Sequence, residues 1–225
     1  MSRALARMKA PAAAHALPAV KRARGRPAQG ASVDRETLLR NARKTFAKHG
    51  YEATSVREIA RVSGVDAALL AHHFGSKDAL WEAVVVQIAE HAAPMIAATD
   101  ALRTSPFGTR ERVERAIAIY IDKVFSEPDI GLFFATAATE EGARLDLLVA
   151  RMVRPYHDVL VPLLADAGKQ KALKVVDAEV LFFMLLNGIS KTVAYGHLMR
   201  VFSTLPEQER KYKRVVLETA LGMLG

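Results

Sequence analysis

Ser55 opens a segment whose residue types suit the binding of a phosphate group. Ser55 and Glu58 stand three residues apart, the spacing of a capping box, in which the serine caps a helix and the glutamate reaches back to it. Backbone N–H groups at a helix start have no partner within the helix, so they can donate to a phosphate. The spacing therefore predicts a helix that begins after Ser55 and offers its first turn to a phosphate.

Three short helices must position this segment. Apolar residues at helical spacing predict the first helix and its buried face: Leu38, Leu39, Ala42 and Phe46. Gly50 ends it as a C-terminal cap residue would, and the second helix runs from Ser55 to a break at Ser63-Gly64. Asp66 is a suitable N-cap for the third helix, which ends at Gly75-Ser76, and Ser76 can cap the next helix from Lys77. Two short helices joined by a tight turn and braced by a first are the layout of a helix-turn-helix, whose second helix enters the major groove of DNA.

The sequence around these helices resembles the DNA-binding domain of TetR-family transcriptional regulators. The resemblance rests on residues 50–60 (GYEATSVREIA), 63–66 (SGVD) and 73–80 (HFGSKDAL), and it covers residues 34 to about 85. It implies a homodimeric repressor with an N-terminal helix-turn-helix domain that binds a double-stranded DNA operator. It also implies a divergent C-terminal domain that binds a small-molecule effector and dimerises.

The resemblance further implies roles for individual side chains. Phosphate contacts fall to Thr54 or Ser55, His73 and Lys77. Base-edge contacts fall to residues that face outward on the third helix, namely Ala67, Leu69, Ala71 and His72. The family usually has Tyr in place of Ala71 and often Thr or Ser in place of Leu69, and alanine and leucine can only pack on thymine methyl groups. His72 is therefore the expected main base-reading side chain, with DNA shape and the N-terminal tail supplying the rest.

Residues 1–33 form a basic tail. They contain seven Lys and Arg residues and no acid, whereas residues 81–225 hold 17 basic and 18 acidic residues. We expect the tail to be disordered, because it is rich in Ala, Pro and Arg and has no helical period. Arg24-Gly25-Arg26-Pro27 resembles the core of the AT-hook, so Arg24 and Arg26 are expected to enter the DNA minor groove. A solubilising leader with no groove preference is the alternative.

The rest of the chain predicts an all-α fold. Helices are expected over residues 77–98, 110–125, 130–139, 143–165, 178–202 and 206–224. Pro94, Pro155 and Pro162 are expected to kink or interrupt the helices that contain them. The predicted organisation is a tail (1–33), a helix-turn-helix domain (34–80) and a helical ligand-binding and dimerisation domain (81–225), with Trp81 at the junction.

The helix predicted over residues 178–202 indicates self-association. Residues 180–186 are apolar on every side, and a helix of that kind must be buried all round. Together with the last helix, it could form a four-helix interface across a two-fold axis. We therefore expect a homodimer.

Aromatic and methionine residues in the C-terminal helices indicate either an ordinary core or a ligand cavity. Candidate lining residues are Tyr120, Phe134, Met152, His157, Phe183 and Asn187. A cavity of this composition would suit a hydrophobic or planar ligand. It leaves open an alternative function, that of a helical small-molecule carrier or enzyme.

Several classes of protein are excluded or disfavoured by the sequence. The absence of cysteine excludes disulfides, thiol catalysis and cysteine-ligated zinc. No Ser-His-acid set, phosphate loop or nucleotide fingerprint is visible, so we expect neither an enzyme nor a cofactor, and adjacent His72 and His73 diverge too far to share a metal. No apolar run reaches the ~18 residues of a membrane helix, so we expect a cytoplasmic protein. A membrane-surface protein anchored by its basic tail is the least favoured alternative, because the tail lacks an apolar face.

Overall fold

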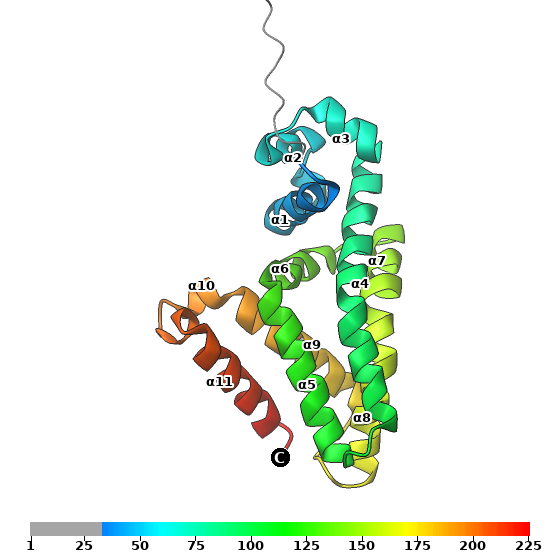
Figure 1. Ribbon diagram of the computed structural model, residues 1–225, viewed down its shortest axis with the longest axis vertical. Coiled ribbons are helices and arrows are strands. Elements are labelled where there is room, and N and C mark those ends of the chain that lie inside the picture. The colour runs from blue at the N-terminus through cyan, green and yellow to red at the C-terminus, as the bar shows by residue number, and fades with distance from the viewer. Residues whose placement is uncertain (1–32) are drawn as a thin grey trace, which may run out of the picture. The chain divides into compact units, whose positions relative to one another are not determined.

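The structure is a computed structural model that describes residues 33–225, and these residues fold into helices and connecting turns without a strand. The α-helices are α1 (Arg35–Ala53), α2 (Val56–Ser63), α3 (Ala67–Phe74), α4 (Lys77–Ala101), α5 (Thr109–Ser126), α6 (Pro128–Ala137), α7 (Ala143–Leu148), α8 (Arg154–Lys169), α9 (Ala178–Ala194), α10 (Gly196–Met199) and α11 (Glu209–Gly222). Three further turns are the 3-10 helices η1 (Leu102–Thr104) and η3 (Leu205–Glu207) and the π-helix η2 (Val149–Val153). The predicted all-α fold is confirmed (Figure 1). Within residues 33–225, no helix is both long and apolar enough to cross a membrane.

Side-chain caps define where the N-terminal helices begin. Asp34, Ser55, Asp66 and Ser76 each accept a hydrogen bond from a backbone N–H of the first turn, at 2.6, 3.1, 2.7 and 3.0 Å respectively. The predicted caps at Ser55, Asp66 and Ser76 are therefore confirmed. Gly50 does not end α1 but kinks it: its φ of +76° is left-handed, and the helix resumes up to Ala53.

The helix predicted over residues 178–202 is wrong in its C-terminal part. α9 ends at Ala194, Tyr195 leaves the helical conformation, and only the single turn of α10 follows. A Cβ added to Gly196 would lie 3.8 Å from Pro206, so the chain beyond the break packs on the segment that leads to α11. A straight helix would carry these residues away from that contact.

Proline acts differently in the helices that contain it. α4 continues through Pro94 and α8 continues through Pro162, so neither proline interrupts its helix. The helix predicted over residues 143–165 is continuous in the structure, but it contains the π-helix η2 between α7 and α8. Pro155 lies in the first turn of α8, directly after η2, and the backbone stays helical on both sides of it.

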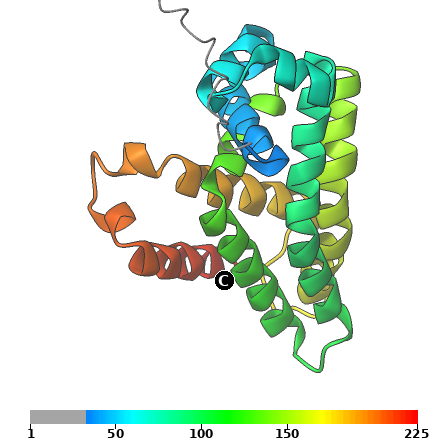
Figure 2. The same cartoon turned by 45° about the horizontal axis from the view of Figure 1, so that its top comes forward.

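Two hydrophobic clusters fill residues 33–225. The first joins α1, α2, α3 and the beginning of α4 to α6 and α7, and includes Leu39, Trp81 and Phe133. The second is built mainly from α5, α8, α9 and α11, and includes Leu164 and Phe182. α4 lies beside α8 in both views, and α3 lies near one end of α4 (Figure 2). α6 packs against α1.

Trp81 lies where the N-terminal helices meet α6. It is 2% exposed, and its ring centroid is 6.0 Å from that of Phe133 and 6.4 Å from that of Tyr51. The indole thus contacts aromatic rings from both the first helix and α6. Residues 33–225 group as one compact unit, and the division of domains after residue 80 stays a prediction.

Candidate nucleic-acid interface and apolar cavity

Gly64 sets the turn between α2 and α3. Its φ of +67° and ψ of +26° are left-handed, a conformation that glycine adopts without a Cβ clash. The N–H of Gly64 donates to the carbonyl of Arg61 at 3.2 Å, and the N–H of Val65 donates to that of Ala60 at 3.0 Å. These bonds end α2 and place Asp66 where it caps α3. The predicted helix-turn-helix geometry is therefore present over residues 56–74.

The outer face of α3 carries few polar side chains. Ala71, His72 and His73 are exposed and Leu69 is 38% exposed, whereas Ala67 is half-buried against the N-terminal cluster. Among the four predicted base-reading positions, only His72 can hydrogen-bond a base edge. Throughout residues 33–225, no three His, Asp or Glu side chains lie close enough together to hold a metal ion.

Thr54 and Ser55 have different roles at the start of α2. Thr54 is 2% exposed, and its hydroxyl donates to the carbonyl of Gly50 at 2.7 Å. Ser55 is exposed, and its Oγ accepts from the N–H of Glu58 at 3.1 Å. Of the two alternatives for a phosphate contact, Ser55 is the one whose side chain is accessible.

Lys77 lies at the start of α4, which packs against α3. Its Nζ donates to the carbonyl of Glu52 at 3.2 Å and lies 4.2 Å from the centroid of the Tyr51 ring. An ammonium group has three N–H donors, so two remain for a phosphate. The two contacts hold the charge of Lys77 at the end of α4 that adjoins α3.

Arg57 and Arg61 of α2 are basic residues that sequence reasoning missed. Both are exposed, and neither forms an ion pair with another residue of the described range 33–225. Their spacing of four residues puts them on one side of α2, which is the signal that could have found them. Exposed cations next to the helix-turn-helix turn suit the phosphate oxygens of a nucleic acid.

An apolar cavity of about 90 Å³ lies between α4, α5, α6, α8 and α9. Flexible methionines, Met95 and Met152, form part of its wall. An engineered protein cavity of about 150 Å³ holds benzene, so this cavity accepts a larger molecule only if its walls move.

Three of the six predicted pocket residues line this cavity. Tyr120, Phe134 and Met152 line it, whereas His157, Phe183 and Asn187 do not. His157 instead contacts Glu179 at 2.7 Å, and the side-chain amide of Asn187 donates to the carbonyl of Phe183 at 3.0 Å. Phe183 is 49% exposed, whereas Leu186 and Ser190 of the same helix line the cavity.

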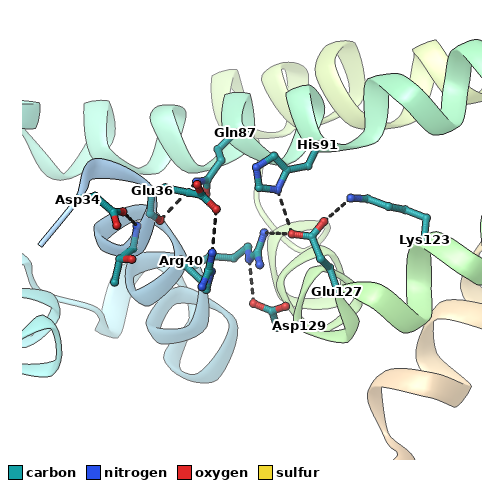
Figure 3. A network of polar contacts seen from close by, with 10 residues as sticks. Asp34, Glu36, Arg40, Gln87, His91, Lys123, Glu127 and Asp129 are labelled. Atoms are coloured by element: carbon teal, nitrogen blue, oxygen red, sulfur yellow. Dashed lines mark hydrogen bonds and ion pairs between the residues drawn. The ribbon is translucent and has the colours of Figure 1, made fainter. Parts of the chain in front are cut away.

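Glu127 connects the cavity wall with α1. Its carboxylate contacts Lys123, lies 2.9 Å from His91 Nδ1 and 3.5 Å from Arg43 Nη1, and Figure 3 shows it between His91 and Lys123. Burial raises the pKa of Glu127, but the hydrogen bonds from Lys123 and His91 outweigh burial and lower the pKa to about 2. Arg43 is 2% exposed and donates from Nε to Asp129 at 2.9 Å. A carboxylate of the cavity is thus linked to a buried arginine of the first helix.

Two stacked tyrosines, with ring centroids 5.2 Å apart, line the cavity but differ in their hydrogen bonds. The hydroxyl of Tyr120 donates to the carbonyl of Leu186 at 3.0 Å. The buried hydroxyl of Tyr156 finds no hydrogen-bond partner within residues 33–225. Burial raises the pKa of both hydroxyls, so both are neutral donors at physiological pH.

Residues 38–84 match the family model described as bacterial regulatory proteins, tetR family. The HTH-type transcriptional repressor ComR of Escherichia coli (strain K12) is 41% identical over 66 residues, which cover 29% of this chain and 30% of ComR. The chain thus matches about a third of the length of its curated relatives. Those relatives are named as transcriptional repressors and not as enzymes.

Solved structures share the fold over most of the chain. PfmR, a TetR family transcriptional regulator from Thermus thermophilus, has a TM-score of 0.59 and 22% identity, covering 82% of this chain and 95% of PfmR. The transcriptional regulator FadR from Bacillus subtilis, solved in complex with stearoyl-CoA, has a TM-score of 0.58 and 15% identity, covering 85% of this chain and 100% of FadR. Residues 38–84 therefore carry an N-terminal domain of the tetR family of bacterial regulatory proteins, and the described chain shares its helical fold with these solved regulators.

Proposed function

We propose that the protein is a homodimeric transcriptional repressor, which binds a palindromic DNA operator and releases it when a small molecule enters the apolar cavity. The observation that carries this proposal is the helix-turn-helix of residues 56–74, whose α3 is exposed on its outer face. The names of the relatives support repression. Because operator DNA lies in the bacterial cytoplasm, we place the protein there.

In the proposed complex, α3 lies in the major groove. His72 hydrogen-bonds a base edge, while Leu69 and Ala71 pack on thymine methyl groups. The phosphate contacts come from the accessible groups Ser55, Arg57, Arg61, His73 and Lys77. Because one polar side chain reads the bases, sequence preference in this interface also depends on the shape of the DNA.

Dimerisation through α9 and α11 is supported by the apolar side chains that these helices expose. Val180 and Met184 of α9 are 58% and 53% exposed, and Met223, which follows α11, is 58% exposed. A groove of about 240 Å³ between the two helices is lined by Met184, Gly188 and Met223. Exposed apolar patches mark interaction sites, and a second copy would supply the matching helices across a two-fold axis.

Coupling between the cavity and DNA is supported by the position of α6. Gly131 of α6 lines the cavity and lies so close to α9 that an added Cβ would be 3.1 Å from the carbonyl of Ser190. A molecule that expands the cavity therefore cannot push α6 toward α9. Because α6 also packs on α1, a displacement of α6 in another direction is passed to the DNA-binding part. The ligand lowers DNA affinity to the extent that it prefers the displaced arrangement.

The test is selection of DNA by the purified protein from a random pool, followed by sequencing. We expect an enriched palindrome whose half-sites lie about one helical turn apart. A variant with Arg57→Ala and Arg61→Ala should retain little DNA, whereas Arg103→Ala, which removes an exposed arginine of η1, should behave as the wild type. No enriched sequence and no retained DNA would overturn the proposal, and would favour a helical carrier that uses the cavity.

A further inference from the structure

The polar atoms at and beside the cavity include more donors than acceptors. The hydroxyl of Tyr156 is buried and has no hydrogen-bond acceptor within the described chain. Arg43 Nη1 is also a buried donor without a hydrogen-bond acceptor there. Lys123 has three N–H donors, and the contact that it makes is with Glu127. Glu127 already faces Lys123, His91 and Arg43 together. The third unpartnered buried atom of the described chain, the acceptor Gln87 Oε1, belongs to a residue outside the cavity lining, so the unmet need in the lining itself is an acceptor.

The Leu186 carbonyl in the cavity wall is not free to accept from Tyr156, whose hydroxyl has no hydrogen-bond partner within residues 33–225. The carbonyl of Leu186 accepts from Tyr120 at 3.0 Å and from the hydroxyl of Ser190 at 2.7 Å. A carbonyl oxygen has two lone pairs, so these two bonds use its capacity. A buried donor without an acceptor costs free energy, and a bound molecule that brings an acceptor removes that cost.

We propose that the cavity binds an apolar molecule that ends in a carboxylate, which accepts from the Tyr156 hydroxyl and pairs with Lys123. This inference rests on the proposed function, because it names the chemical class of the proposed effector. The apolar part lies among Met95, Phe134 and Met152, and the two methionines can change rotamer to admit a chain longer than the cavity now holds.

The charges beside the cavity tolerate a third carboxylate, that of the ligand. Lys123 and Arg43 are cationic, and His91 becomes cationic when protonated, against the two carboxylates Glu127 and Asp129. A ligand carboxylate that takes Lys123 leaves Glu127 with His91 and Arg43. The contact between the cavity wall and α1 then changes, which gives the ligand a direct effect on the DNA-binding part.

The test compares straight-chain carboxylates with amides of the same length, which have nearly the same shape but no charge. Butyrate, hexanoate and octanoate, with their primary amides, are titrated into the full chain by calorimetry. We expect the best carboxylate to bind at least about tenfold more tightly than its amide, the range of a charge-assisted hydrogen bond. Equal affinities of acid and amide, or no binding of any acid at millimolar concentration, would overturn the inference.

Two variants of the stacked tyrosines provide a matched pair. Tyr156→Phe removes the hydroxyl that lacks a partner, so it should leave the fold intact and weaken carboxylate binding about tenfold. Tyr120→Phe removes a hydroxyl that is already bonded to Leu186, and should keep the preference for acid over amide. Lys123→Gln should weaken acid binding and leave amide binding unchanged. Unchanged acid affinity in Tyr156→Phe would contradict the proposal.

DNA binding is measured separately, without any carboxylate, on the sequence selected from the random pool. If the protein selects no DNA, the repressor proposal fails, while the acid–amide comparison still decides the ligand class. If DNA binds but no carboxylate does, only the inference about the ligand fails. If both hold, hexanoate should release the DNA from the wild type at a concentration that leaves Tyr156→Phe bound.

Discussion

Arg43 of α1 donates from its Nε to Asp129 of α6 at 2.9 Å, across 86 residues of sequence. Arg43 is 2% exposed, so its charge depends on this partner and on Glu127 at 3.5 Å. The hydroxyl of Thr136 adds a second link between these helices, donating to the carbonyl of Ala47 at 3.1 Å. Because α6 also lines the cavity, one helix contacts both the first helix of the DNA-binding part and the proposed ligand.

Asp129→Ala should lower the free energy of unfolding by about 3 kcal/mol, because it removes one partner of a buried charge. Urea unfolding measures this loss. The matched control is Asp100→Ala, which breaks a half-exposed pair with Arg103 and should cost less than about 1 kcal/mol. Equal losses of unfolding free energy in the two variants would show that the pair of Arg43 with Asp129 stabilises the fold no more than an exposed ion pair does.

Glu127 should make stability depend on pH below about 5. The pKa of Glu127 is lowered to about 2 in the folded chain from an ordinary value of 4.5, so its contribution is complete above 4.5 and is lost as the pH falls toward 2. Between about pH 5 and pH 3, the wild type should lose about 2 kcal/mol more than Glu127→Gln. Urea unfolding at several pH values tests this, with Glu111→Gln, which breaks an exposed pair with Arg115, as the control. Parallel pH profiles for the wild type and Glu127→Gln would contradict the role of this network.

Met184→Arg should convert the proposed dimer into a folded monomer. Met184 is 53% exposed, so a charge there leaves the core of one chain intact but is buried unpaired if two α9 helices meet. Sedimentation measures the mass, and circular dichroism checks the fold. Ala98→Arg, which adds the same charge at an exposed position of α4, should stay dimeric. A wild type that sediments as a monomer at micromolar concentration would refute the interface.

Lys77→Ala and His72→Ala should affect DNA binding in different ways. Loss of a phosphate contact weakens binding to all sequences alike and reduces the slope of log K against log salt by about one, so we expect this result for Lys77→Ala. Loss of a base contact changes preference at one base pair, which we expect for His72→Ala. Fluorescence anisotropy on selected and random DNA separates the two, with Lys169→Ala at the far end of α8 as the control. The same loss on both DNAs for both variants would overturn the assignment.

Deletion of residues 1–30 should weaken DNA binding without affecting the fold or the dimer. Arg24 and Arg26 lie outside the residues that the structure describes, and their minor-groove role remains a prediction from sequence. Four cations in each of two tails could reach phosphates, and we expect the salt slope to shrink by about 3 to 5 and the preference for flanking A·T pairs to disappear. Unchanged affinity and slope between about 50 and 200 mM salt would identify the tail as a solubilising leader.

The sequence alone determined the features that depend on neighbours a few residues away. Ser55, Asp66 and Ser76 cap helices because each side chain reaches a backbone N–H within its own first turn. Gly64 makes the turn because its backbone conformation depends on the absence of its own Cβ. For the same reason, local sequence predicts the helix-turn-helix and the exposure of Leu69, Ala71 and His72, whereas the predicted outward position of Ala67 is wrong because it packs against the N-terminal cluster.

Tertiary structure decided which candidate residues share a cavity and which lie outside it. Phe183 lies outside the cavity, although it is as apolar as Phe134, because the rotation of α9 is set by its packing. Local spacing carries no information about such packing. The contact of Arg43 with Asp129 likewise joins residues far apart in the chain, and only the folded arrangement of α1 and α6 brings them together.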